Sequence, residues 1–121
     1  MIRTSTGLWL LVLGITVISG LADAQGFLHA ARIWEGGRFS IGALARSASG
    51  FAVGIGLYYF GLQYQEALGI RAPEIQTVSW FAVTLIGVAL FSGRFASWRL
   101  LDQTIAVLVL MGIAWLMVRT A

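Results

Sequence analysis

Three charged residues lie just inside long apolar stretches of the chain, where an isolated charge is costly. They are Asp23, Arg46 and Asp102. Ionisable groups in such surroundings normally pair with one another or line water. If the stretches run antiparallel, all three belong to the same side, and we expect Arg46 to lie within ion-pair reach of Asp23 or Asp102. This charge cluster serves as an interfacial clamp or, alternatively, as a gate or a cation-attracting vestibule.

A second set of side chains suits the noncovalent binding of a small solute. The aromatic rings of Tyr59 and Trp80 can hold an apolar or cationic group through cation–π contact, and Thr16 adds a hydroxyl in the first apolar stretch. Glu74 follows Pro73 and either caps a helix by complementing its dipole or selects a solute at a cavity mouth. We predict that Thr16, Tyr59, Trp80 and Glu74 bind substrate, although hydroxyls in helices also bond to their own backbone.

The residue types that most enzymes and metal sites need are scarce. The chain has no cysteine and a single histidine, His29, so thiolate and histidine metal sites are not expected. No paired acid and base is suitably placed for catalysis. All eight basic residues are arginines at the ends of apolar stretches, opposed by five carboxylates, for a net charge of +3. We therefore expect neither an enzyme, a metal site, a cofactor nor a nucleic-acid partner.

Four apolar stretches joined by short connections must position these residues. Hydrophobic residues make up 59% of the 121 and charged residues 11%, and about 20 apolar residues of helix cross a bilayer core. This pattern predicts an all-α membrane protein, a four-transmembrane-helix bundle with short loops. Residues 1–121 form one integral membrane domain with helices at about 7–24, 40–65, 74–92 and 99–118. Residues 3–24 also resemble a secretory signal, but we favour an uncleaved first helix.

The expected topology places both termini and the 66–73 loop on one side of the membrane. The 25–39 and 92–98 connections lie on the other side, with five of the eight arginines. The positive-inside rule therefore places these two connections in the cytoplasm. We expect a multi-pass protein of the bacterial inner membrane.

The second apolar stretch carries small residues at spacings that keep them on one helix face. They are Ala43, Ser47, Gly50, Gly54 and Gly61. Helices associate in lipid through the close approach that small residues allow. We expect Gly50, Gly54 and Gly61 to pack against another helix, either within one bundle or at a dimer seam.

Several short motifs accompany the four stretches: Gly26-Phe27, Tyr59 to Tyr64, Pro73 with Trp80, and Phe91-Ser92-Gly93-Arg94. With the length and span spacing, they resemble the small multidrug resistance family and its drug/metabolite transporter relatives. The resemblance implies antiparallel homodimers, with Tyr59 and Trp80 near a solute. In that family a glutamate in helix one binds proton and cation, whereas residues 14–19 here contain Thr16 and no carboxylate. The resemblance therefore does not extend to proton coupling.

Two functions of different classes fit the sequence. The leading hypothesis is a small transporter-like protein that handles a small or amphipathic solute. The alternative is a non-transporting accessory or scaffold subunit, favoured by the lack of an ionisable group in mid-membrane. Expected partners are the lipid bilayer and either further copies of the chain or a larger membrane complex. A polar cavity that reaches mid-membrane would favour transport.

Overall fold

The computed structural model describes residues 2–120, and this part of the chain is helical without strands. It contains four long helices: α1 (Ile2–Ala30), α2 (Ile41–Ala67), α3 (Pro73–Ser92) and α4 (Leu100–Thr120). Two single-turn 3₁₀ helices lie in the connections, η1 (Glu35–Gly37) and η2 (Phe95–Ser97). The predicted all-α class is confirmed.

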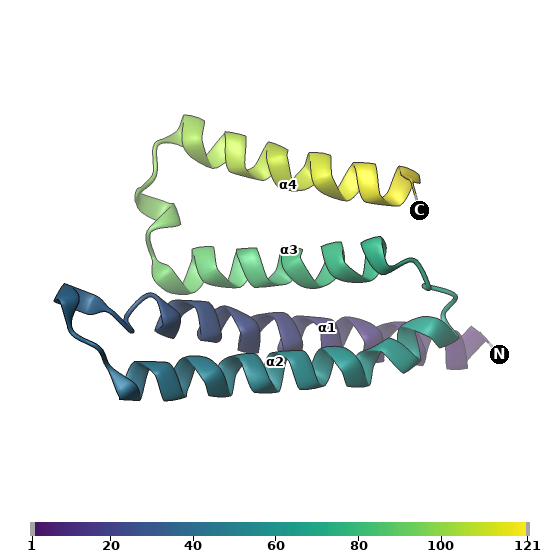
Figure 1. The fold of residues 1–121 in the computed structure, drawn as a ribbon. Coiled ribbons are helices and arrows are strands. Elements are labelled where there is room, and N and C mark those ends of the chain that lie inside the picture. Colours follow the sequence, from purple (N-terminus) through teal and green to yellow (C-terminus); the bar gives the residue numbers. More distant parts are fainter. Residues whose placement is uncertain (1, 121) are drawn as a thin grey trace.

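The helices lie side by side, and α1 is at the centre of the packing. It contacts α2 along most of its length and α3 along a second face, whereas α4 packs against α3. The order across the layer is therefore α2, α1, α3, α4 (Figure 1). Helices that follow one another along the chain run in opposite directions, so the neighbours α1 and α3 are parallel. The start of α1 and the end of α4 lie at the same end of the layer.

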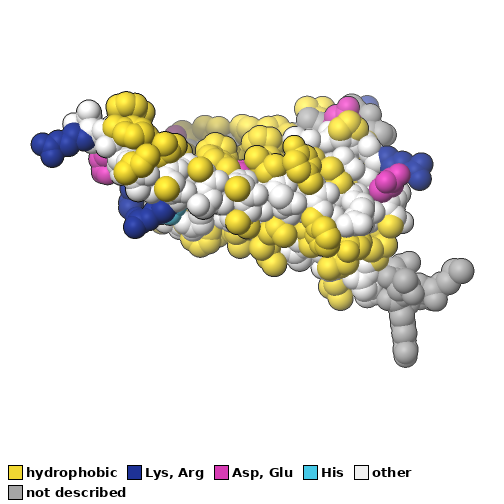
Figure 2. Space-filling view, turned by 60° about the horizontal axis from the view of Figure 1, so that its bottom comes forward, with side chains coloured by type: hydrophobic (Ala, Val, Ile, Leu, Met, Phe, Trp, Pro, Cys, Tyr) yellow, Lys and Arg dark blue, Asp and Glu magenta, His cyan; other side chains and the backbone are white. Residues whose placement is uncertain are grey.

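Three of the helices are long and apolar enough to cross a membrane. The spans cover Thr6–Ala30, Ile41–Ala67 and Pro73–Ser92, and the apolar stretch of α4, Leu100–Leu116, is shorter. On the face drawn in Figure 2, arginine side chains gather at the two ends of the molecule, with hydrophobic side chains between them. This arrangement is compatible with a multi-pass integral membrane protein.

Local signals fix most helix ends where the sequence predicts them. Ser40 caps α2, because its hydroxyl accepts a hydrogen bond from the Ala43 amide at 3.1 Å. Pro73 occupies the first turn of α3, and Gly93 ends that helix with a φ of 70°. The exception is α1, which ends at Ala30 rather than near residue 24. This extension places Asp23 about two turns inside the helix.

Close backbone contact between α1 and α2 depends on two glycines of α2. A Cβ atom at Gly50 would lie 2.7 Å from the backbone nitrogen of Gly26, and one at Gly54 would lie 3.0 Å from the nitrogen of Asp23. Beside them, the Ser47 hydroxyl donates to the Gly26 carbonyl at 2.7 Å. The small-residue face of α2 is thus occupied by α1 of the same chain.

The last helix is held by one narrow face. Gln103, Ala106 and Leu110, at positions i, i+3 and i+7, are the partly covered residues of α4, and most of its other described side chains are exposed. The Gln103 amide donates to the Phe95 carbonyl at 2.7 Å and anchors the start of the helix. Its remaining faces are open to lipid or to another protein.

We predict that Gly50→Ala destabilises the protein, because the added methyl overlaps the α1 backbone rather than a movable side chain. Overpacking costs about 1–3 kcal/mol, of which better helix propensity recovers at most about 1 kcal/mol. Thermal unfolding in mild detergent measures the loss. The matched control is Gly56→Ala on the same helix, where no atom outside the local backbone of α2 lies within 4 Å of the added Cβ. Equal stability of the two variants would contradict the proposed close approach.

Candidate functional site

A stripe of polar side chains runs along the face of α1 that lies between α2 and α3. Thr16, Ser19 and Asp23 occupy positions i, i+3 and i+7, so they share one helix face. Gln65 from α2 and Trp80 with Thr84 from α3 complete the stripe. We call these six residues the polar seam.

Ser19 joins three helices through one hydroxyl group. It accepts a hydrogen bond from the indole nitrogen of Trp80 on α3 at 2.9 Å and donates one to the Gly54 carbonyl on α2 at 2.6 Å. Its side chain is 1% exposed. Because the Gly54 carbonyl already belongs to the α2 helix, the hydroxyl adds a second donor to it. The polar seam is therefore part of the helix packing as well as a candidate site.

Asp23 is a carboxyl group buried inside a span. It is 1% exposed, hydrogen-bonds with the Thr84 side chain, and has no partner for Oδ2. The Thr84 hydroxyl in turn donates to the Trp80 carbonyl at 3.0 Å. A buried acceptor without a donor costs free energy in an apolar medium. Asp23 is thus the most unusual polar group in the described chain.

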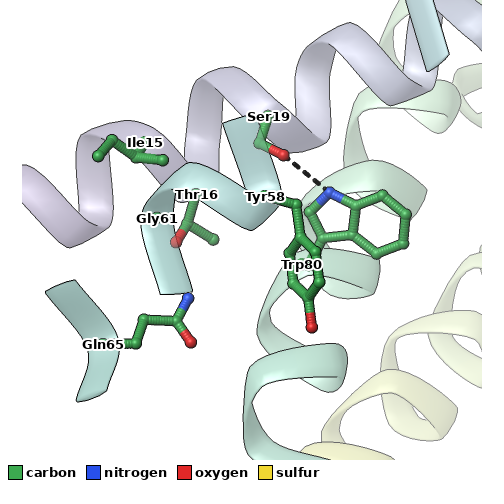
Figure 3. A pocket seen from close by; sticks show the side chains of 7 residues that line it. All are labelled: Ile15, Thr16, Ser19, Tyr58, Gly61, Gln65 and Trp80. Carbon is green, nitrogen blue, oxygen red and sulfur yellow. Dashed lines mark hydrogen bonds between the residues drawn. The ribbon is translucent and has the colours of Figure 1, made fainter. Parts of the chain in front are cut away.

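A small cavity lies at the other end of the polar seam (Figure 3). Its volume is about 10 Å³, close to the minimum for one water molecule. Residues from all three packed helices line it: Ile15, Thr16, Ser19, Tyr58, Gly61, Gln65 and Trp80. Gln65 is buried, and its Oε1 atom has no hydrogen-bond partner. This cavity supplies a second unpaired acceptor, also facing the α1–α2–α3 junction.

The four predicted substrate-binding residues lie in three places. Thr16 and Trp80 line the small cavity together. Tyr59 lies outside it, 68% exposed, and the neighbouring Tyr58 takes the inward position with its ring 5.2 Å from that of Trp80. Glu74 is at the first turn of α3, at the end of a separate apolar groove between α3 and α4.

The predicted charge cluster is not assembled. Arg46 lines a groove with His29 and Arg32 rather than contacting Asp23, and the described residues contain no ion pair between Arg46 and either carboxylate. The longer α1 explains the separation, since Asp23 lies level with Gly54 of α2, two turns deeper than Arg46. Asp102 lies on α4, which packs beyond α3. The structure thus places Arg46 in this groove and leaves Oδ2 of Asp23 without a partner.

Gln65 and Tyr58 line the small cavity but were not among the predicted site residues. Their spacing from the glycines of α2 could have indicated them. Both lie on the α2 face of Gly54 and Gly61, at helical spacing. Among the described residues, no group of three or more His, Cys, Asp or Glu side chains is placed to hold a metal ion. The polar seam offers hydroxyl, amide, indole and carboxyl groups, which can bind a solute by hydrogen bonds or charge.

No family model, curated protein sequence or solved structure matches the chain. The candidate site is therefore defined by its geometry.

We predict that Ser19 and Trp80 are energetically coupled. Ser19→Ala leaves the indole N–H of Trp80 without its acceptor, at a cost of about 1–3 kcal/mol, whereas after Trp80→Phe the Ser19 hydroxyl still donates to the Gly54 carbonyl. The cost of Ser19→Ala should therefore be smaller when Trp80 is already replaced. A double-mutant cycle with Ser19→Ala and Trp80→Phe, read as unfolding free energy in detergent, should give a coupling of about 0.5–2 kcal/mol. Ser79→Ala is the control, because its exposed hydroxyl bonds only to the Ile75 carbonyl of its own helix. Additive losses would argue against the hydrogen bond.

Proposed function

We propose that this chain is a small four-span, transporter-like protein of the bacterial inner membrane, and that its polar seam binds a small cationic or hydrogen-bond-donating solute. The observation that carries the proposal is Asp23, a buried carboxyl with an unpaired oxygen inside a membrane-spanning helix. Ionisable residues at this depth mark solute, ion or proton pathways by default.

The chemistry of the polar seam favours a ligand that brings donors. Its two unpaired atoms, Oδ2 of Asp23 and Oε1 of Gln65, are both acceptors. Asp23 lies beside Gly54 of α2, and Gln65 is 11 residues further along that helix. The two acceptors are therefore roughly 16 Å apart along the helix axis. The groups between them, Thr16 and Ser19, are hydroxyls that can accept or donate. An ammonium group or another organic cation that carries N–H donors would pair with one of these acceptors and then, further along the polar seam, with the other.

Asp23 also shares a hydrogen-bond chain with α3. The single hydroxyl proton of Thr84 can serve the Trp80 carbonyl or the Asp23 carboxylate, but not both at once. A protonated Asp23 would donate to Thr84 and leave the Thr84–Trp80 bond intact, whereas an ionised one would compete for it. Proton loss or cation binding at Asp23 would therefore act on the α1–α3 contact, which is a physical route from ligand binding to helix movement.

The alternative function, a non-transporting accessory or scaffold subunit, is favoured by a different observation. The polar seam is closed, with a cavity of only about 10 Å³, while α4 leaves most of its surface exposed. Transport requires α1, α2 or α3 to separate, whereas a scaffold needs only the open face of α4. The exposed α4 face also fits a homodimer, which either function accommodates.

We predict that Asp23→Asn weakens cation binding, because the amide keeps the shape of the side chain but loses its charge. The probes are methylammonium and tetraethylammonium, tested for thermal stabilisation of the purified protein and for uptake into proteoliposomes. Loss of a charge-assisted hydrogen bond should weaken binding on the order of tenfold or more.

Asp102→Asn is the matched control, since that carboxylate is exposed at the start of α4. If both variants respond to the probes as the unaltered chain does, the polar seam is not the binding site. If the unaltered chain neither binds nor transports the probes and co-purifies with a stoichiometric membrane partner, the accessory function replaces the transporter.

We predict that α4 crosses the membrane, so that Ser97→Cys and Arg119→Cys react with a membrane-impermeant maleimide from opposite sides. The chain has no cysteine, so each variant carries a single reporter thiol. Labelling of sealed cells and of inverted vesicles compares the two sides. Labelling of both positions from one side would leave a three-span protein with a surface helix.

A further inference from the structure

The connection between α1 and α2 forms a groove with an unbalanced positive charge. The groove has a volume of about 450 Å³ and is built by residues 29–46 alone. Its charged lining consists of Arg32, Arg38, Arg46 and Glu35, with His29 beside them. Three arginines against one carboxylate leave a net charge of +2 when His29 is neutral.

Backbone hydrogen bonds define the course of the connection that carries these side chains. The Ser40 amide donates to the Ile33 carbonyl at 2.8 Å, and the Arg38 amide donates to the Glu35 carbonyl at 3.2 Å, which closes the turn around η1. Arg46 approaches from the second turn of α2. Like charges gathered on one groove repel one another unless an anion lies between them.

The start of α2 faces the same groove. Gly42 belongs to its first turn and lines the groove, and amides in a first turn have no partner within the helix. Ser40 satisfies the Ala43 amide. The arginine set and the helix start therefore favour the same ligand, a group with several negatively charged oxygens.

The groove lies at the level expected for lipid headgroups. It sits at the ends of two membrane-spanning helices, where Figure 2 places dark blue arginine side chains beside the cyan histidine. The adjacent Trp34 and Phe39 rings contact each other at a tilt of 50°, with centroids 5.0 Å apart, and are exposed. Tryptophan prefers the membrane interface.

We propose that this groove is a binding site for the phosphodiester headgroup of an anionic phospholipid. Guanidinium groups form paired hydrogen bonds with phosphate oxygens, and basic pockets between helices at a membrane surface bind such headgroups. The lipid source follows from the interfacial position, because the phosphate layer of the bilayer meets the groove while the acyl chains lie along the exposed apolar helices. The site is separate from the polar seam and does not depend on transport.

The test measures lipid binding to the purified full-length chain by native mass spectrometry in a neutral detergent at physiological salt. Dioleoyl phosphatidylglycerol is compared with dioleoyl phosphatidylcholine, which has the same acyl chains and no net charge. We expect tighter binding of phosphatidylglycerol. Arg32→Gln with Arg38→Gln should weaken it on the order of fivefold for each arginine removed.

The matched control is Arg94→Gln with Arg99→Gln, in the connection between α3 and α4. That connection lies at the same end of the molecule as the groove (Figure 1), so the control removes equal charge from the same leaflet. An equal loss in both double variants would overturn the proposal in favour of general surface attraction, as would equal binding of the two lipids by the unaltered chain.

A charge-conserving variant and two soluble competitors complete the test. Arg32→Lys with Arg38→Lys keeps the charge but not the paired hydrogen bonds, and we expect binding between that of the unaltered chain and the glutamine variant. This variant also serves if the glutamine variant does not fold. Inorganic phosphate and glycerol 3-phosphate are added as competitors. If millimolar amounts of either displace the lipid completely, the groove is a site for soluble phosphate and the lipid proposal is wrong.

Discussion

The packing of α1, α2 and α3 depends on the hydroxyl of Ser19. Helices in lipid gain little from burying apolar side chains against one another, so hydrogen bonds and close backbone contact carry the association. Ser19 supplies both at one point, since it bonds to Trp80 and to the Gly54 carbonyl, and Gly54 is small enough to bring α2 against α1. In Figure 1, α1 lies between α2 and α3, the two helices that this junction joins to it.

The same junction creates the candidate site. Because α1 lies between two helices, its polar face with Thr16, Ser19 and Asp23 is shielded from lipid on both sides. A shielded acceptor costs free energy when it has no hydrogen-bond partner, and among the described residues Oδ2 of Asp23 and Oε1 of Gln65 are such acceptors. A protein that only needed a stable bundle would gain by replacing these groups with apolar ones. The unpaired acceptors of Asp23 and Gln65 therefore support the proposal that the polar seam binds a ligand.

Charge is distributed in two very different ways along α1. Asp23 is buried within the span, whereas His29 and Arg32 lie at its end among other arginines and face an open groove. The buried carboxyl favours a cationic or donor-rich ligand, and the groove favours an anionic one. The two proposed sites would therefore take ligands of opposite charge, and they lie about two turns of helix apart along α1.

The sequence by itself determined the helical class, the apolar spans and most helix ends, because these depend on local composition and on caps such as Ser40, Pro73 and Gly93. Thr16 and Trp80, which the sequence analysis singled out, line one small cavity, but the tyrosine beside them is Tyr58 rather than Tyr59. Only the tertiary structure decided that Arg46 and Asp23 are apart. The physical reason is that α1 continues six residues beyond its expected end at residue 24, which places Asp23 deeper in the span. The depth of a residue in a bilayer depends on the length of its helix and on the helix packed against it, not on the residue type.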